Sequence, residues 1–247
     1  MEQDIPILEV KNLTLLQPNL FNNVNFSLYK GDFSIVLGGN GSGKTTFLKI
    51  VTGATYGLKI VDNYEIKYNG RLLKTTDDFQ YFRREICFIE QKDDNDNFDY
   101  STPYEEVFYS VANINSNINK KQLKEKVVNL FDYFQVKNIM HKKIKVLSGG
   151  QKRLVSIMAG LIRDDAKLFL IDEPINNLDT KNAILVSNYI TNLHKRNPSS
   201  AIMLVTHCRM FPKVSKAYEI INKQIVKSEY KYQTCFGCAN KDGLYEI

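Results

Sequence analysis

The sequence predicts an α/β fold with a mostly parallel sheet, and three observations lead to this prediction. The continuous apolar runs 33–37 and 167–171 are typical of strands that are buried on both faces of a sheet. A glycine-rich stretch joins the first run to a helix that we expect at 44–51. The segments 167–171, 180–195 and 201–205 follow the order strand, helix, strand, which indicates parallel pairing.

Short apolar runs alternate with turn residues in the N-terminal part of the chain. Strands are expected at 7–10 and 24–28, and Lys30-Gly31-Asp32 is a turn signal between the second of them and the buried run that follows. Residues 57–90 favour mixed short strands, the last of them at 86–89.

The middle of the chain is predicted to be helical. Residues 92–100 are acidic and polar and are interpreted as a loop. From 104 to about 135, apolar residues recur at three- and four-residue spacing, as in an amphipathic helix: Leu123, Val127, Leu130, Phe131 and Phe134. A further helix is expected at about 149–163.

Composition excludes several classes of protein. Of the 247 residues, 43% are hydrophobic and 24% charged, which is typical of a globular protein and not of a disordered chain. No apolar run approaches the roughly 18 residues of a membrane span, and the N-terminus lacks a signal-peptide pattern. The net charge of +6 fits nucleotide phosphates, RNA or a membrane surface equally well. The four cysteines are too few for a disulfide framework.

The glycine-rich stretch matches the pattern G-x-x-x-x-G-K-[ST] in full and predicts a phosphate-binding loop. Glycines let backbone N–H groups surround phosphate oxygens, and the following helix presents its positive end to the same anion. Lys44 is expected to reach the β and γ phosphates, and the hydroxyl of Thr45 to ligate Mg²⁺. The predicted nucleotide-binding residues are Gly38, Gly39, Asn40, Gly41, Ser42, Gly43, Lys44, Thr45 and Thr46. The pattern alone leaves kinases, GTPases and ATPases open.

Two carboxylates end the second buried strand, where a parallel sheet delivers residues to its ligand-binding edge. Asp172 is suited to hold Mg²⁺, through water, and Glu173 to accept a proton from an attacking water. The alternative is a strand that runs into an ordinary acidic turn. The phosphate-binding loop in the same chain favours the catalytic interpretation.

A second anion-binding segment, Leu147-Ser148-Gly149-Gly150-Gln151, opens a predicted helix. With these elements in this order, the chain resembles the ATP-binding cassette (ABC) family from about Ile7 to Val226. The resemblance implies a P-loop NTPase core with a mostly parallel sheet, an N-terminal antiparallel β subdomain and a helical signature subdomain. We expect a cassette at 1–228, with the helical subdomain inserted at about 92–160, and an appendage of unknown role at 229–247.

The resemblance also assigns roles to residues. It implies that Gln91 senses Mg²⁺ and the γ-phosphate, that Asp179 lies in a segment crossing between two sites, and that His207 contacts the γ-phosphate. The implied cofactors are ATP and Mg²⁺. The expected catalytic residues are Glu173, His207, Lys44 and Gln91, the metal ligands Thr45, Gln91 and Asp172, and the further nucleotide contacts Ser148, Gly149, Gly150, Gln151 and Asp179.

An assembly follows from the same resemblance. ATP is sandwiched between the P-loop of one cassette and the Leu-Ser-Gly-Gly-Gln segment of another, so the active form is expected to be a homodimer or heterodimer that ATP closes and hydrolysis opens. A separate polytopic membrane subunit is expected as partner, and no nucleic acid. The chain would then be an ATPase that powers transport of an unknown substrate, cytoplasmic and peripheral on the cytoplasmic face of the membrane.

Two alternatives stay open beside transport. A soluble ABC ATPase that acts in cofactor or complex assembly would carry the same residues. A binding module that has lost hydrolysis is disfavoured by the intact Glu173 and His207. The aromatic residues of the predicted helical part are either core or a docking surface for a membrane subunit: Phe98, Tyr100, Tyr104, Phe108 and Tyr109.

The chain departs from the family pattern at the adenine side. Gln17 stands where the family has an aromatic residue that stacks on adenine, and Leu16, Leu20 or Phe21 would offset this in part. Ile175 replaces a more usual threonine, with little effect expected.

Two further patterns are discounted. The acidic run 93–99 lacks the glycine and glutamate of a calcium loop. The single pair Cys235 and Cys238 is interpreted as incidental, with metal or redox use as the alternative.

Overall fold

The computed structural model describes residues 5–91, 98–114 and 118–233, which form two compact units. Of the described residues, the first unit comprises 5–90, 166–173 and 191–233, and the second comprises 91, 98–114, 118–165 and 174–190. Helix α6 (Thr180–Arg196) is divided between them. Among the described residues, no helix combines the length and the apolar character that crossing a membrane requires.

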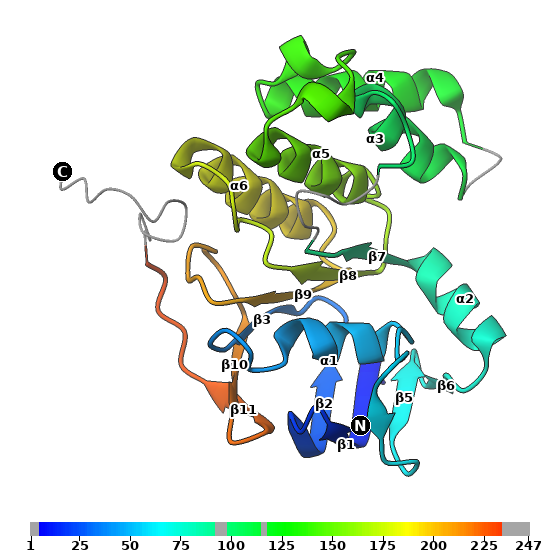
Figure 1. Ribbon diagram of the computed structural model, residues 1–247, viewed down its shortest axis with the longest axis vertical. Coiled ribbons are helices and arrows are strands. Elements are labelled where there is room, and N and C mark those ends of the chain that lie inside the picture. The colour runs from blue at the N-terminus through cyan, green and yellow to red at the C-terminus, as the bar shows by residue number, and fades with distance from the viewer. Residues whose placement is uncertain (1–4, 92–97, 115–117, 234–247) are drawn as a thin grey trace. The chain divides into compact units, whose positions relative to one another are not determined.

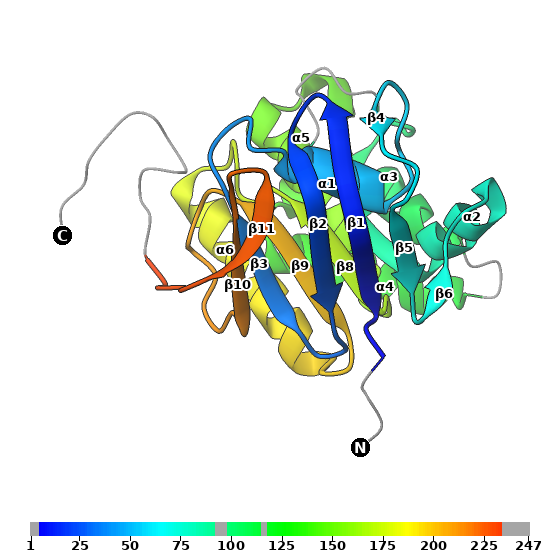
Figure 2. The same cartoon turned by 90° about the horizontal axis from the view of Figure 1, so that it is seen from below.

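The first unit contains an antiparallel sheet of five strands in the order β2-β1-β5-β6, with β4 also paired to β1 (Figure 2). Its strands are β1 (Leu8–Gln17), β2 (Phe21–Leu28), β4 (Lys59–Ile60), β5 (Glu65–Tyr68) and β6 (Arg71–Leu72). Buried residues alternate with partly buried ones along β5 and with exposed ones along much of β2, as expected for a sheet with one face on the core.

The second sheet of this unit has the order β11-β10-β3-β9-β8-β7 and is parallel except for the β10–β11 pair. Its strands are β3 (Phe33–Leu37), β7 (Ile86–Ile89), β8 (Leu168–Asp172), β9 (Ala201–Thr206), β10 (Lys216–Ile221) and β11 (Gln224–Ser228). Strands β3, β8 and β9 are buried along their whole length, which explains their continuous apolar sequences.

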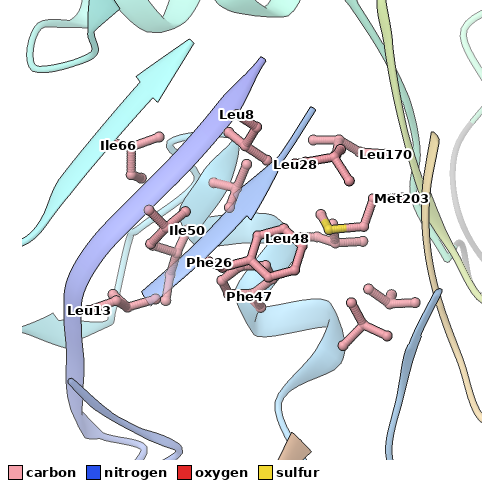
Figure 3. Packing of buried hydrophobic residues seen from close by; sticks show 14 of the residues in the cluster. Leu8, Leu13, Phe26, Leu28, Phe47, Leu48, Ile50, Ile66, Leu170 and Met203 are labelled. Carbon is pink, nitrogen blue, oxygen red and sulfur yellow. The ribbon is translucent and has the colours of Figure 1, made fainter. Parts of the chain in front are cut away.

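Helix α1 (Lys44–Val51) lies between the two sheets (Figures 1 and 2). Its apolar side chains join one core cluster with residues of both sheets, among them Phe26 of β2 and Met203 of β9 (Figure 3). The rings of Phe26 and Phe47 meet edge to face with centroids 5.6 Å apart. Burying a phenylalanine in this way stabilises the fold by about 1.5–3 kcal/mol, so this core holds the start of α1 in place.

The expectation of mixed strands throughout 57–90 is wrong for residues 76–85, whereas the strand expected at 86–89 is present. Residues Thr76–Glu85 form helix α2 directly before β7. The helix begins with a capping box: the Thr75 hydroxyl accepts from the Asp78 N–H at 3.1 Å, and the Asp78 carboxylate accepts from the Thr75 N–H at 2.9 Å. The hydrogen bonds that the Asp78 carboxylate accepts from the N–H and the hydroxyl of Thr75 hold the pKa of Asp78 well below its ordinary value. The pair Thr75 and Asp78 was therefore a sequence signal for a helix start.

The second unit is helical, but the predicted continuous helical stretch at 104–135 is interrupted. It consists of α3 (Pro103–Ala112) and α4 (Lys120–Tyr133). The hydroxyl of Thr102 and the side chain of Asn119 cap the two helices. The unit also contains helix α5 (Gly149–Leu161), the short 3₁₀ turns η1 (Lys137–Ile139) and η2 (Ile144–Val146), and the part of α6 up to Ile190.

The predicted aromatic cluster of this unit is mostly paired within itself. Tyr100 stacks on Tyr109 with centroids 4.7 Å apart, and Tyr104 stacks on Phe108 at 5.8 Å. Phe108 is buried, whereas Tyr109 is partly exposed. Part of the cluster is therefore core, and its use as a docking surface stays a prediction.

Candidate active site

The phosphate-binding loop follows β3 and leads directly into α1. Gly43 has φ +101°, and a Cβ there would lie 2.9 Å from the ring of Phe21, so both backbone and space require glycine. A Cβ on Gly38 would lie 2.5 Å from the Ser42 Oγ atom. The first and last glycines of the loop are thus fixed by close contacts.

Lys44, the first residue of α1, is buried and lies back over the loop. Its Nζ atom donates to the carbonyl oxygens of Gly38 at 2.9 Å and Gly39 at 3.1 Å. The only ammonium group of the loop is therefore held at the centre of the predicted phosphate site. A cation in that place compensates phosphate charge.

Strand register brings the loop and the acidic residues to the same edge of the sheet. Leu37, which precedes the loop, is opposite Thr206 in β9, and Val205 is opposite Asp172 in β8. Because these strands are parallel, their carboxyl ends lie together, as the sequence predicted.

Glu173 leaves β8 in a left-handed backbone conformation with φ +44°, which is uncommon for a residue other than glycine. Its N–H donates to the carbonyl oxygen of Val205 at 2.9 Å. The Oε2 atom accepts from the Thr206 hydroxyl at 2.8 Å and from the His207 N–H at 3.4 Å. The Oε1 atom lies 3.1 Å from Nδ1 of His207 and 3.4 Å from Nζ of Lys44.

Three of the four predicted catalytic residues therefore meet within the first unit: Lys44, Glu173 and His207. Glu173 is 4% exposed, whereas the His207 side chain is about one-third exposed. The donors around this buried carboxylate orient it, and a general base must be oriented in this way. Gln91, the fourth, is half-buried and opens the second unit directly after β7.

Two oxygen groups in this unit suit Mg²⁺. Asp172 is fully buried at the end of β8, and Thr45 is half-buried in the first turn of α1. Magnesium prefers such carboxylate and hydroxyl oxygens completed by phosphates and waters. The described residues hold no cluster of three His, Cys, Asp or Glu side chains that would bind a metal alone. The donor set fits an ion that is bound together with phosphate.

The second predicted anion segment lies in the second unit and starts α5. The Ser148 hydroxyl accepts from the Gln151 N–H at 3.3 Å, and the Gln151 side chain accepts from the Ser148 N–H at 3.1 Å. This capping box gives both residues a structural role within their own chain. Ser148 is exposed, and Gly149 and Gly150 are half-buried. In the same unit Asp179 is exposed and accepts from the N–H of Asn182 at 2.8 Å, before α6 begins.

At the predicted adenine side, Gln17 is exposed at the end of β1. Leu20 approaches the phosphate-binding loop, since a Cβ on Gly43 would lie 3.4 Å from its side chain. Phe21 is buried in the core, so its ring is not available for stacking. Ile175 is buried as well. The acidic residues 93–97 and the pair Cys235 and Cys238 lie outside the described residues.

The family model for "ABC transporter" matches residues 21–176, which is more than half of the chain. The chain belongs to the ABC transporter family. This membership confirms the resemblance, the predicted fold class and the prediction of an ATP-hydrolysing transporter subunit.

Individual ABC proteins are similar along most of the chain. The lipoprotein-releasing system ATP-binding protein LolD of Buchnera aphidicola is 31% identical over 215 residues, 85% of this chain and 90% of LolD. Among solved structures, cbiO1 of Clostridium perfringens, part of the ABC transporter complex cbiONQ, has a TM-score of 0.70 at 21% identity and covers 91% of this chain and 88% of its own. The ATP-binding cassette MJ0796, solved as a dimer in a post-hydrolysis state with ADP and Pi, has a TM-score of 0.74 at 20% identity. The match covers 91% of this chain and 99% of the MJ0796 chain.

Sequence reasoning missed one contact of this ABC site. The sequence pattern places Thr206 only at the end of a strand, yet its hydroxyl is within 2.8 Å of Glu173. The signal was its place beside His207, at the carboxyl end of a strand that pairs with both β3 and β8.

Proposed function

We propose that this chain is the subunit that binds and hydrolyses ATP for a transporter whose membrane-spanning part is formed by separate chains. The observation that carries the proposal is the convergence on Glu173 of Lys44, Thr206 and His207 within one unit. Such an arrangement places a base next to the cation of a phosphate-binding loop. It supports hydrolysis of a bound nucleoside triphosphate rather than binding alone.

In this proposal each residue of the site has one task. Lys44 shifts its hydrogen bonds from the loop carbonyls to the β and γ phosphates of ATP. Glu173 orients the attacking water and accepts its proton. His207, whose ring lies beside Glu173, contacts the γ-phosphate. Thr45 and Asp172 would hold Mg²⁺, which neutralises charge that develops on the phosphates.

The proposal includes a pair of cassettes. Each chain carries one P-loop and one Leu-Ser-Gly-Gly-Gln segment, so two chains facing each other would complete two sites. MJ0796 was solved as a dimer, and cbiO1 is part of a complex with further chains. A second cassette, in a homodimer or heterodimer, and a polytopic membrane subunit are therefore the proposed partners, with the chain on the cytoplasmic face of the membrane. The proposed cassette spans 1–228, with its helical subdomain at about 92–160.

The first experiment measures steady-state ATP hydrolysis by the purified chain and by Glu173→Gln. The variant keeps size and hydrogen bonding but cannot accept the proton. We expect hydrolysis to fall by at least about 100-fold while ATP still binds, with an ATP-dependent dimer on gel filtration. Equal rates for the two proteins would remove Glu173 from this role.

A second experiment separates transport from the alternative of a soluble assembly ATPase. The tagged chain is purified from membranes in detergent and from the soluble fraction, and its partners are identified. Recovery with a polytopic membrane protein supports transport. Recovery with soluble scaffold proteins alone, and none from membranes, would overturn the transport part of the proposal and leave the ATPase part standing.

A further inference from the structure

We propose that Thr206 is a positioning residue of the hydrolytic site, which holds the carboxylate of Glu173 so that Oε1 is the oxygen that receives the water proton. The inference rests on the proposed function and deepens it. It adds a residue to the site that acts through Glu173 without touching the nucleotide.

The hydrogen bonds of the Thr206 hydroxyl define its direction. The side chain is fully buried, so water does not compete for it. Its oxygen accepts from the N–H of Cys208 at 3.1 Å and lies 2.8 Å from Oε2 of Glu173. A carboxylate oxygen only accepts, and a hydroxyl has a single proton, so this proton points to Glu173. Hydrogen bonds of this charge-assisted kind are about twice as strong as neutral ones.

The two carboxylate oxygens of Glu173 have different surroundings. Oε2 faces the end of β9, through the Thr206 hydroxyl and the His207 N–H at 3.4 Å. Oε1 faces Nζ of Lys44 at 3.4 Å and the ring of His207 at 3.1 Å. Because Lys44 marks the phosphate site, Oε1 is the oxygen turned toward the substrate. Anchoring Oε2 on Thr206 therefore decides which oxygen is presented.

The backbone of Glu173 makes this anchor necessary. Its φ of +44° is a strained conformation that non-glycine residues keep only when the surroundings fix it. Two consecutive residues of β9 fix Glu173, since the Val205 carbonyl oxygen accepts from the Glu173 N–H at 2.9 Å and the Thr206 hydroxyl donates to the carboxylate.

In hydrolysis the water oxygen bonds to the γ-phosphorus, the bond to the leaving ADP oxygen breaks, and the water proton moves to Oε1.

The test compares two substitutions. Thr206→Val keeps the branched shape but removes the donor, whereas Thr206→Ser keeps the hydroxyl and removes a methyl group. For the valine variant we expect kcat to fall roughly 10- to 100-fold, as for a lost hydrogen bond to a charged group, with KM for ATP within about twofold. For the serine variant we expect kcat within about threefold of wild type. Thermal unfolding and ADP calorimetry verify that both variants are folded.

A double-mutant comparison tests whether Thr206 affects hydrolysis through Glu173. In Glu173→Ala, adding Thr206→Val should lower the residual rate by less than about twofold, because the carboxylate that Thr206 orients is absent. If Thr206→Val fails to fold, Thr206→Cys replaces it, since a thiol of similar size is a weak donor, and the same fall in kcat is expected.

Three results would overturn the inference: an unchanged kcat without the hydroxyl, a serine variant as slow as the valine one, or an independent further loss in Glu173→Ala. Failure of the proposed function looks different, because the wild-type chain itself would then not hydrolyse ATP.

Discussion

The Nζ atom of Lys44 lies 3.4 Å from Oε1 of Glu173, and the two side chains are only 7% and 6% exposed. Neither charge is solvated by bulk water, so each depends on its neighbours in the site. Removing one member of a buried ion pair leaves the other charge uncompensated, and this typically costs about 3–5 kcal/mol. The proposed phosphate-binding cation and the proposed base are therefore coupled in stability.

Our first prediction follows from this pair. Lys44→Ala should lower the affinity for ATP by at least about 10-fold, because it removes the ammonium group that is held over the phosphate-binding loop. It should also lower the free energy of unfolding by about 3 kcal/mol, since Glu173 loses its cation. Calorimetry with ATP and urea unfolding measure the two effects.

Lys49→Ala is the matched control for Lys44→Ala. Lys49 lies on the same helix and pairs with Glu90 at 3.5 Å, but both side chains are more than 40% exposed. An exposed pair contributes about 0–1 kcal/mol, so this variant should bind ATP as the wild type does. Equal ATP affinity in Lys44→Ala and Lys49→Ala would contradict the assignment of Lys44.

A second prediction concerns Tyr230, which lies after β11 and hydrogen-bonds to Phe211 in the loop that follows His207. Its hydroxyl donates to the carbonyl oxygen of Phe211 at 2.9 Å and accepts from the Phe211 N–H at 3.2 Å. Burial raises the pKa of Tyr230 to about 12. The fold thus favours the neutral phenol. The stabilisation that Tyr230 provides is full below about pH 10, the ordinary pKa of a tyrosine in the unfolded chain. It is lost as the pH rises toward 12, the pKa in the folded chain.

Tyr230→Phe should accordingly destabilise the chain by about 1 kcal/mol at pH 8, and the difference from wild type should shrink between pH 10 and pH 12. Thermal unfolding across pH 8–12 measures it. Tyr232→Phe is the control, because Tyr232 is half exposed. A Tyr230→Phe variant as stable as wild type at pH 8 would show that the two bonds to Phe211 contribute nothing.

The sequence predicted structure best where a local run of one residue type indicates one kind of element. Continuous apolar runs predicted β3, β8 and β9 to within about a residue, because strands buried on both faces are made mostly of apolar residues. Helix α2 was missed because most of its side chains are polar or charged and Phe82 is its one buried residue, so no apolar period marked it. Its capping box was the stronger signal.

The sequence also predicted some features of the candidate site and not others. Lys44 and Glu173 were predicted because each ends a recognisable segment, the loop and the buried strand. Their ion pair and the hydroxyl of Thr206 were not, since these contacts depend on the register among β3, β9 and β8. Residues far apart along the chain meet there only after the sheet has formed.

Our third prediction concerns the adenine side. Gln17 is exposed at the end of β1, where an amide offers no aromatic face to a base. Stacking on an aromatic side chain is worth roughly 1–3 kcal/mol per base in nucleic-acid systems, so Gln17→Tyr should tighten ATP binding about 5- to 100-fold and improve discrimination against GTP. Gln17→Leu, apolar but without a ring, is the control. If both variants bind ATP like wild type, Gln17 does not face adenine.

The last prediction tests whether two chains share each ATP site. Ser148 is exposed at the start of α5, where the proposed dimer would present it to the ATP of a partner chain. Ser148→Arg should leave ATP binding to the single chain nearly intact, because the P-loop is unchanged. Dimer closure and hydrolysis should be lost, because a bulky side chain occupies the place of the γ-phosphate.

The Ser148 hydroxyl also caps α5, so the substitution by itself removes about 1 kcal/mol of helix stability. Ser148→Ala removes the same cap without adding bulk, and the difference between the two variants isolates the steric effect. Mixing Ser148→Arg with Lys44→Ala then makes dimers in which one site carries both lesions and the other carries neither. We expect such mixtures to hydrolyse ATP although each variant alone does not, with a rate that rises with the square of protein concentration at low concentration. Full hydrolysis by Ser148→Arg alone, independent of its concentration, would show that each chain works with its own site only.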